Sequence, residues 1–403
     1  MPGPLEGYRV IDMTSVVSGP LATMMLGDQG AEVIKVENPD GGDFTRAVSN
    51  RRGGYSAAFL NNNRSKRSVA INTKDPRGME VVKKLLIGAD VFIQNMRPGV
   101  IQRMGLGEAT VREIAPEIIY VSISGFGERG PYADRPVYDP LVQALSGLTT
   151  IQGGSDEARP RLVRTIVPDK LTGVMAAQAI TAALLSRERT GQGQHVRLSM
   201  LDSVVNFLWH SDMGSQTFVG GEFPQEKAQS FIDLIYETTE GHISVAVNTD
   251  KQWANLANAL GHPEWLSDPR FATPALRHQN IDSRLSLTQS VLATNTAAHW
   301  LKILEEADVP CAPILRRCDV IHHPQIQANE TVSIYEHPHA GPLRQTRPAA
   351  RFSLTDPVIT RGAPTLGEYT LDVLLNLGYD HRMIETLIAE GVIGAYGFDK
   401  AAE

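Results

Sequence analysis

Asp169 is the residue in this sequence whose type and position best fit covalent chemistry. It follows Pro168 and begins the run DKLTGVMAAQAITAALLSRER, in which apolar residues recur at helical spacing. An aspartate at a helix start is a favourable N-cap, because its carboxylate can accept a hydrogen bond from the backbone N–H of Leu171 or Thr172. The positive end of the helix would also keep this carboxylate ionised at neutral pH, available as a nucleophile, and would stabilise a developing oxyanion. A cap and a nucleophile are both open interpretations.

Basic side chains cluster near the predicted carboxyl ends of two strands. They are Arg64, Lys66, Arg67 and Lys74, followed by Arg97 and Arg103. Ligands of open α/β sheets bind in the crevice outside the carboxyl ends of the strands. A positively charged rim at that edge predicts a ligand that carries phosphate groups, and a solvated charged loop is the alternative.

Three other kinds of site are disfavoured by motifs that the sequence lacks. The opening strand–turn–helix–strand pattern ends at Glu37, but residues 18–20 supply one glycine where a dinucleotide-binding G-x-G-x-x-G needs three. The histidines at 322–323 and 337–339 lie in a proline-rich stretch without carboxylates at ligand spacing, so no metal site is expected. A G-x-S-x-G elbow is absent, which disfavours an α/β-hydrolase, and both cysteines are expected to be packing residues.

Composition narrows the class of protein. The 403 residues carry 45 acidic and 38 basic side chains, a net charge of −7, which argues against the clustered basic surface of a nucleic-acid-binding protein. Two cysteines in so long a chain exclude a disulfide-stapled scaffold. Neither a signal-peptide pattern nor an apolar run of about 18–20 residues occurs. We therefore expect a cytoplasmic protein with no nucleic-acid or membrane partner.

Alternating strand and helix patterns are expected to position these residues. Apolar strand-like runs at 8–13, 31–37, 90–95 and 118–126 are separated by helical patterns, one of which, at 75–89, begins with an Asp-Pro pair. Strand, helix and strand in this rhythm predict βαβ units and a mostly parallel sheet with helices on its faces.

The middle of the chain has a different pattern. Residues 231–248 predict an antiparallel hairpin that turns at Glu240–Gly241, and helical segments follow. We expect a large α/β domain built from residues 1–205 and 345–403, with a smaller α+β domain at 225–325 between them.

Long motifs that run in order through most of the chain carry a family resemblance. They are LEGYRVIDMTSVVSGPLATMMLGDQGAEVIKVENPDGGDFTR, NRSKRSVAINTKDPRG, ADVFIQNMRPGVIQRMGLG, SISGFGERGPYADRPVYD, PDKLTGVMAAQAITAALL, RERTGQGQHVRLSMLDSV, GHPEWLSDPRF and VPCAPIL. Together they resemble the class III coenzyme A-transferases, the CaiB/BaiF family. The resemblance implies a Rossmann-like large domain, a smaller domain, and two subunits threaded through each other as interlocked rings. Extended connectors at 212–230 and 322–348 would permit that threading.

The resemblance also implies roles for individual residues. Asp169 falls on the family's catalytic aspartate. Coenzyme A (CoA) would be a substrate, with no other cofactor and no metal. The positions that fall on or beside the family's CoA site are Val17, Asn38, Ile71, Asn72, Thr73, Lys74, Asn95, Met96, Arg97, Arg103, Arg135 and Tyr138.

Departures from the family's patterns limit which of the family's reactions and substrates this sequence fits. Tyr138 stands where related racemases carry a histidine base, so abstraction of an α-proton would lose half of its acid–base pair. Val17 stands where formyl-CoA:oxalate transferases have a glutamine, and no run of four glycines occurs within 231–310, so an acid larger than oxalate is favoured. Asn38 stands where an arginine often lies near the adenine.

We therefore expect an acyl-CoA:carboxylate CoA-transferase that works as an intertwined homodimer through a covalent aspartyl intermediate. Its partners would be an acyl-CoA and a carboxylic acid, whose identities the sequence does not specify. A 2-methylacyl-CoA racemase and a non-catalytic CoA-binding protein are the alternatives.

Overall fold

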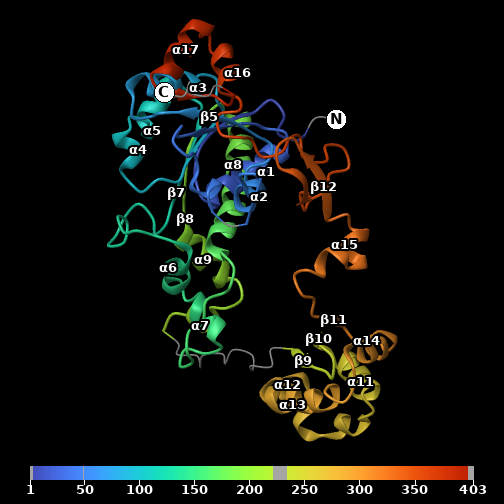
Figure 1. The fold of residues 1–403 in the computed structure, drawn as a ribbon. Helices are drawn as coiled ribbons and strands as arrows, with labels where there is room; N and C mark the ends of the chain where they lie inside the picture. The colour runs from blue at the N-terminus through green and yellow to red at the C-terminus, as the bar shows by residue number, and fades with distance from the viewer. Residues whose placement is uncertain (1–2, 49, 221–233, 398–403) are drawn as a thin grey trace. The chain divides into compact units, whose positions relative to one another are not determined.

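The chain folds into two compact units, seen in a computed structural model that describes residues 3–48, 50–220 and 234–397 (Figure 1). The first unit consists of Met1–Thr149, Leu162–Met213 and Asn329–Glu403. The second consists of Thr150–Arg161 and Gly214–Ala328. Both ends of the chain therefore contribute to the first unit.

A seven-stranded sheet forms the centre of the first unit in the described part of the chain. Its strands, in their order across the sheet, are β14 (Ile393–Gly394), β5 (Lys66–Ile71), β2 (Glu32–Glu37), β1 (Arg9–Met13), β6 (Val91–Gln94), β7 (Ile119–Ser124) and β8 (His195–Ser199). All neighbours pair in parallel except β14, which is antiparallel to β5. β1 has β2 on one side and β6 on the other, so the loops after β1 and β6 flank the switch point where such sheets bind ligands.

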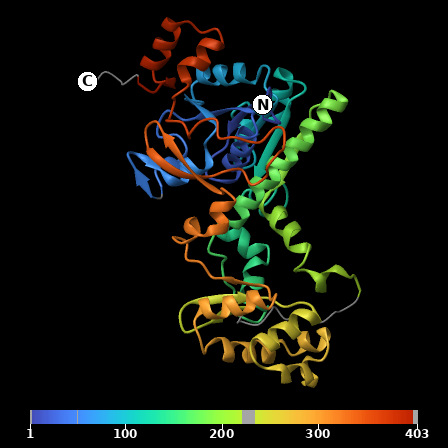
Figure 2. The ribbon, with the colours of Figure 1, turned by 90° about the vertical axis from the view of Figure 1, so that its right-hand side faces the viewer.

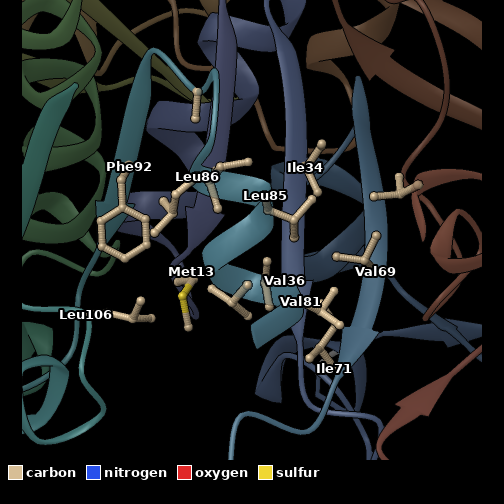
Figure 3. Packing of buried hydrophobic residues seen from close by; sticks show 14 of the residues in the cluster. Met13, Ile34, Val36, Val69, Ile71, Val81, Leu85, Leu86, Phe92 and Leu106 are labelled. Carbon is tan, nitrogen blue, oxygen red and sulfur yellow. The ribbon is translucent and has the colours of Figure 1, made fainter. Parts of the chain in front are cut away.

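Helices cover both faces of this sheet. On one face pack α3 (Pro76–Leu86), α4 (Val100–Arg103), α5 (Glu108–Ile114), α16 (Thr370–Asn376) and α17 (His381–Ala389). On the other face pack α1 (Ser18–Asp28) and α8 (Val167–Thr190). Figure 3 shows the first of these cores, in which Val81 and Leu85 of α3 lie against Ile34, Val36 and Val69 of the sheet. Burial on both faces explains why the inner strands are continuous apolar runs.

The last helices of the chain complete the first core. α16 and α17, red in Figures 1 and 2, contribute Val373, Leu374, Ile384 and Leu387 to the same core as α3. β14 then adds the antiparallel edge strand beside β5. The predicted α/β fold with a mostly parallel sheet is confirmed.

Smaller elements of the first unit connect or flank the sheet. They are β3 (Arg51–Arg52), β4 (Tyr55–Ser56), α2 (Ala57–Asn62), α6 (Asp139–Leu145), α9 (Met200–Trp209), β12 (Val332–His337) and β13 (Gly341–Thr346), while α7 (Leu148–Gly153) crosses the boundary to the second unit.

The predicted extended connector at 322–348 is wrong for most of its length. It contains α15 (Pro324–Ala328) and the antiparallel β12–β13 hairpin. The hairpin belongs to the first unit, because Gln345 Nε2 donates to the carbonyl oxygen of Leu60 at 3.3 Å and Arg52 Nη2 donates to those of Ala340 and Pro342 at 2.6 Å. These long-range bonds hold a segment that local sequence presented as a proline-rich loop.

The second unit combines a small antiparallel sheet with helices. Its strands are β9 (Ile235–Glu237), β10 (His242–Val245) and β11 (Cys311–Pro313), and its helices are α10 (Gly214–Thr217), α11 (Asp250–Ala259), α12 (Pro274–Gln279), α13 (Ile281–Leu292), α14 (Ala297–Glu306) and α15. Trp253, Trp265 and Trp300 lie in its core. The antiparallel pairing of β9 with β10 confirms the predicted hairpin around Glu240–Gly241. Residues 221–233, which hold part of that predicted hairpin, of the 212–230 connector and of the 225–325 domain, lie outside the described residues.

Within the described ranges, no helix combines the length and apolar character that crossing a bilayer requires. The cytoplasmic location and the interlocked homodimer stay predictions.

Candidate active site

The turn between β1 and α1 carries the first part of the site. Its backbone is strained at Val16, whose φ of 72° lies in the left-handed region that β-branched residues avoid. Gly19 permits the turn, because a Cβ there would lie 2.3 Å from Cβ of Thr14. Val17 is buried by this turn, and Ser18 begins α1 with its backbone N–H and hydroxyl hydrogen-bonded to Asp169.

Two buried ion pairs support this turn, and the first is that of Lys35 with Asp43. Lys35 Nζ lies 3.0 Å from Asp43 Oδ2 and donates to the carbonyl oxygen of Thr14 at 2.7 Å. Asp43 Oδ1 accepts from the backbone N–H of Val16 at 3.3 Å. Burial opposes the charge of Lys35, but nearby carboxylates, Asp12 foremost, outweigh it and raise the pKa of this amine. The strained residue is thus tied to an ion pair whose charged form its surroundings favour.

The second pair is that of Asp12 with Lys66. Lys66 Nζ lies 3.1 Å from Asp12 Oδ2 and donates to the carbonyl oxygen of Pro20 at 2.9 Å, in the first turn of α1. Asp12 also accepts from the backbone N–H of Thr14 at 2.8 Å and from Thr23 Oγ1 at 2.7 Å. Burial lowers the pKa of Lys66 to about 8. Together the two pairs hold both sides of the turn.

Asp169 lies in the first turn of α8, next to a second carboxyl group. Its backbone N–H donates to Oδ2 of Asp139, which is buried at the start of α6, at 3.4 Å. Gln143 Nε2, one turn later in α6, donates to Asp139 Oδ1 at 2.6 Å and fixes the orientation of that carboxyl group. Gly173 lets α8 pack closely on α1, because a Cβ there would lie 2.7 Å from the carbonyl oxygen of Ser18. This close packing brings Asp169 to Ser18.

The surroundings of Asp169 favour its neutral form. Burial, and then the charge of Asp139, raise the pKa of Asp169 to about 6, against hydrogen bonds from Ser18 that act in the opposite direction. Burial also raises the pKa of Asp139, although Gln143 and the N–H of Asp169 act against it. Asp169 is still mostly ionised at neutral pH, and a carboxylate that has lost part of its water shell is available to attack an electrophile.

The predicted N-cap role of Asp169 is wrong. α8 begins at Val167, so Asp169 is the third residue of the helix, and the N-cap position belongs to Ile166, whose side chain makes no capping bond. The helix end was also expected to keep this carboxylate ionised at neutral pH, and with a pKa of about 6 it is mostly ionised there. Burial and the charge of Asp139 nevertheless raise this pKa above the ordinary aspartate value, an effect that the sequence did not predict.

The turn after β6 meets the turn after β1. Asn95 Oδ1 accepts from the backbone N–H of Ser15 at 2.9 Å, and Asn95 Nδ2 donates to the carbonyl oxygen of Ser15 at 2.8 Å. The backbone N–H of Met96 donates to Gln94 Oε1 at 2.8 Å. Arg97 follows and is exposed. We call residues 95–97 the β6–α4 turn, and its side-chain bonds fix it to the switch point of the sheet.

Two cavities open beside the β6–α4 turn, and Met96 lies in the walls of both. The β2 cavity, of about 190 Å³, has walls that include Met13, Lys35, Asn38, Ile71, Thr73 and Met96. The β7 cavity, of about 270 Å³, has walls that include Gln94, Met96, Arg97, Gln102, Ser122 and Glu128. The structure therefore brings together five predicted site residues: Asn38, Ile71, Thr73, Met96 and Arg97. Both cavities lie at the carboxyl ends of parallel strands, where a ligand was expected.

Three other predicted basic or amide residues lie near these cavities but outside their walls. Asn72 and Lys74 follow β5, and Asn72 Oδ1 accepts from the backbone N–H of Lys74 at 3.1 Å. Arg103 ends α4 and is exposed, and its Nη1 would lie 3.0 Å from a Cβ placed on Gly99. Lys74 and Arg103 thus leave cationic groups in solvent close to the same edge of the sheet.

Arg135 and Tyr138 lie on the segment that leads to α6. The guanidinium carbon of Arg135 lies 3.8 Å from the ring centre of Tyr132. Tyr138 is 73% exposed and directly precedes Asp139. Like Val17, Asn95 and Asp169, these two residues are not in the walls of either cavity.

Three basic residues expected at the carboxyl ends of the strands lie elsewhere. β5 begins at Lys66, so Arg64, Lys66 and Arg67 are at its amino end. Arg64 is buried against Asp28, with Nη2 at 2.8 Å from Oδ2 and Nε at 3.1 Å from Oδ1. Lys66 is buried with Asp12. These ion pairs neutralise two of the basic side chains that the sequence had predicted to bind phosphate groups.

Glu37 is likewise occupied within the protein. Its carboxylate accepts from Arg46 Nη2 at 2.7 Å, from Ser68 Oγ at 2.7 Å and from the backbone N–H of Asp43 at 3.0 Å. The acidic group that a dinucleotide-binding fold would offer to a ribose is thus held by its own neighbours.

Sequence reasoning missed Asp139 and a histidine-centred group of residues. Asp139 precedes Pro140, and this Asp-Pro pair is the same helix-start signal that marked Asp75–Pro76, so it could have been found. Ser122 and His195 carry no such signal, because each lies within a β-strand and belongs to no local motif. In the described ranges, no cluster of three or more His, Cys, Asp or Glu side chains could hold a metal ion.

Comparison with known proteins identifies the family. A family model described as CoA-transferase family III matches residues 5–370. The chain belongs to CoA-transferase family III. This family III CoA-transferase is 37% identical over 401 residues to the succinyl-CoA:glutarate CoA-transferase of Mus musculus, a match that covers 97% of the chain and 90% of the relative.

A second relative and a solved structure agree with this assignment. The acetyl-CoA:oxalate CoA-transferase of Acetobacter aceti is 33% identical over 372 residues, which cover 91% of the chain and 94% of the relative. A crystal structure of a CaiB/BaiF family protein from Brucella suis superposes with a TM-score of 0.81 at 30% identity, covering 94% of this chain and all of that one (100%). The predicted family and the predicted class of enzyme, an acyl-CoA:carboxylate CoA-transferase, are confirmed.

Proposed function

We propose that Asp169 is the nucleophile of this CoA-transferase, and that it exchanges CoA between succinyl-CoA and a dicarboxylate of about the size of glutarate. The observation that carries the choice of nucleophile is the partly buried Asp169 carboxylate, which meets Ser18 and Asp139 and has a pKa raised to about 6. The buried, apolar Val17 supports an acid larger than oxalate. The succinyl-CoA:glutarate relative at 37% identity supports this pair of acids.

In the first half of the proposed reaction, the donor acid is released. An oxygen of Asp169 attacks the thioester carbonyl carbon, the C–S bond breaks, and the CoA thiolate leaves behind a mixed anhydride. The thiolate then attacks the carbonyl carbon of Asp169, and breaking of the anhydride C–O bond frees the donor carboxylate. Asp169 is left as a thioester of CoA.

In the second half, the acceptor takes the CoA. The acceptor carboxylate attacks the carbonyl carbon of the aspartyl thioester and expels the CoA thiolate. This attack joins the acceptor to Asp169 in a second mixed anhydride. The thiolate attacks the acyl carbon of that anhydride, so the new acyl-CoA leaves and the carboxylate of Asp169 is restored. Each step exchanges one activated acyl bond for another, so the free energy of the thioester is kept as long as water is excluded.

The CoA moiety in this proposal lies along the β6–α4 turn. Lys74, Arg97 and Arg103 supply positive charge for its phosphates, and the β2 and β7 cavities supply enclosed space on either side of Met96. No metal or redox cofactor takes part in the proposed steps.

A second copy of the chain completes the proposed enzyme. Apolar side chains on α6, α8 and α9 are about half exposed in the single chain: Leu141, Leu145, Val174, Leu185, Phe207 and Trp209. Exposed apolar surface of this extent is typical of a surface that another protein covers. An intertwined homodimer, as the family resemblance implies, would cover it.

A screen of acyl-CoA donors against monocarboxylates and dicarboxylates, measured by mass spectrometry, tests the activity. We expect succinyl-CoA with glutarate to be turned over faster than any pair that contains oxalate. The same incubations with 2-methylacyl-CoA in deuterium oxide test the racemase alternative, and no deuterium should enter the α-position. CoA binding with no turnover for any pair would favour the non-catalytic alternative.

The variant Asp169→Asn tests the nucleophile. An amide cannot attack a thioester, so turnover should fall by at least about a thousandfold. The variant should be at least as stable as the wild type at pH 8: an acid whose pKa is higher in the folded than in the unfolded state costs stability once pH exceeds the unfolded value, and asparagine removes that cost.

Trapping gives a positive readout for the same residue. Hydroxylamine added during turnover should convert the activated carboxyl group to a hydroxamate on the peptide that contains Pro168–Asp169. An unmodified peptide during continued turnover, or near-normal turnover of Asp169→Asn, would mean that the nucleophile lies elsewhere.

A further inference from the structure

Four polar side chains form a continuous hydrogen-bonded chain at the wall of the β7 cavity. Gln94 Nε2 lies 3.0 Å from Ser122 Oγ, Ser122 Oγ lies 2.9 Å from His195 Nε2, and His195 Nδ1 lies 2.7 Å from Glu108 Oε2. They come from β6, β7, β8 and α5, and Gln94 and Ser122 line the cavity. We call these four residues the Gln94 relay.

The hydrogen bonds of the relay can run in one direction only. The backbone N–H of Met96 donates to Gln94 Oε1, so the amide must present its Nε2 donor to Ser122. At the other end, burial opposes the charge of Glu108, but hydrogen bonds from Arg112 and His195 lower the pKa of this carboxyl, which therefore acts as an acceptor. His195 must then carry its proton on Nδ1, and its bare Nε2 accepts the hydroxyl hydrogen of Ser122.

The order Ser–His–Glu is also that of a nucleophilic triad, but the surroundings favour another role. Ser122 lies inside β7, paired on both sides, and its oxygen already accepts from Gln94. The end of the chain of bonds is the backbone N–H of Met96, in the β6–α4 turn. The relay therefore ends at the segment to which the proposed function assigns CoA.

We propose that the Gln94 relay is a positioning device that holds the β6–α4 turn in the conformation that binds CoA, and that it does so only while His195 is neutral. The proposal rests on the proposed function, because that function assigns CoA to this turn. The bond of Asn95 to Ser15 holds the same turn from the side of β1, so the relay supplies the restraint from the side of β7.

Protonation of His195 would reverse one hydrogen bond of the relay and leave one hydroxyl hydrogen without its acceptor. Both ring nitrogens would become donors, and Ser122 would receive hydrogen bonds from Gln94 and His195 while its own hydroxyl lost its acceptor. Burial lowers the pKa of His195, and the nearby Arg197 acts in the same direction, whereas Glu108 and Glu128 raise it. The ring of Tyr120 also packs edge-on against the imidazole. The net effect is to lower the pKa of His195, which favours the neutral imidazole at pH 7 and means that the ring gains its proton at a lower pH than an unperturbed histidine.

Two substitutions at position 195 separate the halves of the relay. Asparagine can still donate to Glu108 near the position of Nδ1 but cannot reach Ser122. Glutamine can place its amide oxygen near the position of Nε2 and accept from Ser122, and it does not titrate. A third variant, Ser122→Ala, removes the middle of the relay without touching His195, and His381→Asn, on the exposed start of α17, is the matched control.

Calorimetric titration with CoA at pH 7.5 is the first measurement. We expect His195→Asn and Ser122→Ala to weaken binding about fivefold to tenfold, as loss of a buried hydrogen bond does, and His195→Gln and His381→Asn to stay within about twofold of wild type. Equal affinities for wild type, His195→Asn and Ser122→Ala would overturn the proposal. If His195→Asn does not fold, the comparison of Ser122→Ala with wild type decides.

The pH profile is the second measurement, and it uses the ratio of the wild-type affinity to the His195→Gln affinity, in which titration of the CoA phosphates cancels. This ratio should fall as pH is lowered from 7.5 to 5, because only the wild type gains the proton. A constant ratio would overturn the requirement for a neutral His195.

Steady-state kinetics separate positioning from chemistry. His195→Asn should raise KM for acyl-CoA and leave KM for the acceptor acid and the trapping of Asp169 unchanged. An acyl group found on the Ser122 peptide would make Ser122 a nucleophile and overturn the proposal. A wild type that binds CoA but transfers it to no acid would refute the proposed transfer and leave the relay to be judged by its binding data, whereas a wild type that binds no CoA would overturn both.

Discussion

Two carboxyl groups from different helices meet at the proposed nucleophile. Asp139, the first residue of α6, accepts a hydrogen bond from the backbone N–H of Asp169, and its charge is second only to burial in raising the pKa of Asp169. A carboxylate with a raised pKa is more basic and less hydrated, and both properties increase its tendency to attack a thioester. Ser18 opposes the shift and keeps the group mostly ionised at pH 7.

The fall of kcat at low pH, the acid limb of the pH profile, should therefore follow the protonation of Asp169. With both substrates saturating, kcat of the wild type should fall tenfold per pH unit below about 6, because only the ionised carboxylate attacks. In Asp139→Asn the limb should move to lower pH, since the neighbouring charge is removed. Asp372→Asn, an exposed change on α16, should leave the limb in place. A limb that stays at the same pH in Asp139→Asn would contradict the electrostatic role of Asp139.

At the scale of elements, the site is made by loops that follow β1 and β6. The β1–α1 turn is strained at Val16 and rests on the ion pairs Lys35–Asp43 and Lys66–Asp12, whereas the β6–α4 turn is held by Asn95 and Gln94. The strands that precede these turns, β1 and β6, have most of their side chains buried in the core. Hydrogen bonds and ion pairs from side chains of neighbouring elements therefore hold each turn in its conformation, which the backbone of the turn does not fix by itself.

Arg103, at the end of α4, tests the placement of CoA on this element. A charge-assisted bond to phosphate contributes about 1.5–3 kcal/mol, so Arg103→Ala should raise KM for acyl-CoA about tenfold or more and spare KM for the acceptor acid. Arg382→Ala, on the exposed surface of α17, is the control. An unchanged KM for acyl-CoA in Arg103→Ala would remove this arginine from the site.

At the scale of the whole molecule, one chain leaves apolar surface on α6, α8 and α9 uncovered. α6 and α8 also carry Asp139 and Asp169, so a partner that covers these helices would lie beside the nucleophile and help to exclude water from it. The proposed homodimer thus connects assembly with the chemistry of the site.

The homodimer predicts a mass of about twice 44.0 kDa in light scattering. If the two chains are interlocked, dilution to nanomolar concentration should not release monomers, because separation requires one chain to unfold. A stable, active monomer at micromolar concentration would contradict both the homodimer and its interlocking.

Some features of this protein follow from the sequence alone because they depend on neighbours along the chain. Alternating apolar runs and helical spacing determined the βαβ pattern, and the Pro168–Asp169 pair before a long helical run marked the start of α8 and the candidate nucleophile. The residues 95–97 after β6 were also predicted from their place at a strand end and the family resemblance. Local spacing is sufficient for such features because each residue's partners lie within one or two turns of it.

Only the tertiary structure decided which charged side chains stay in solvent and which are paired with other side chains inside the protein. Arg64 and Lys66 are paired with Asp28 and Asp12 of other elements, and Asp169 acquires its raised pKa from burial and from Asp139, which is 30 residues away in the sequence. The Gln94 relay joins four elements, and none of its members has a local signal. Burial and charge act through space, so their effect on a side chain depends on residues that only the folded chain brings within a few ångströms.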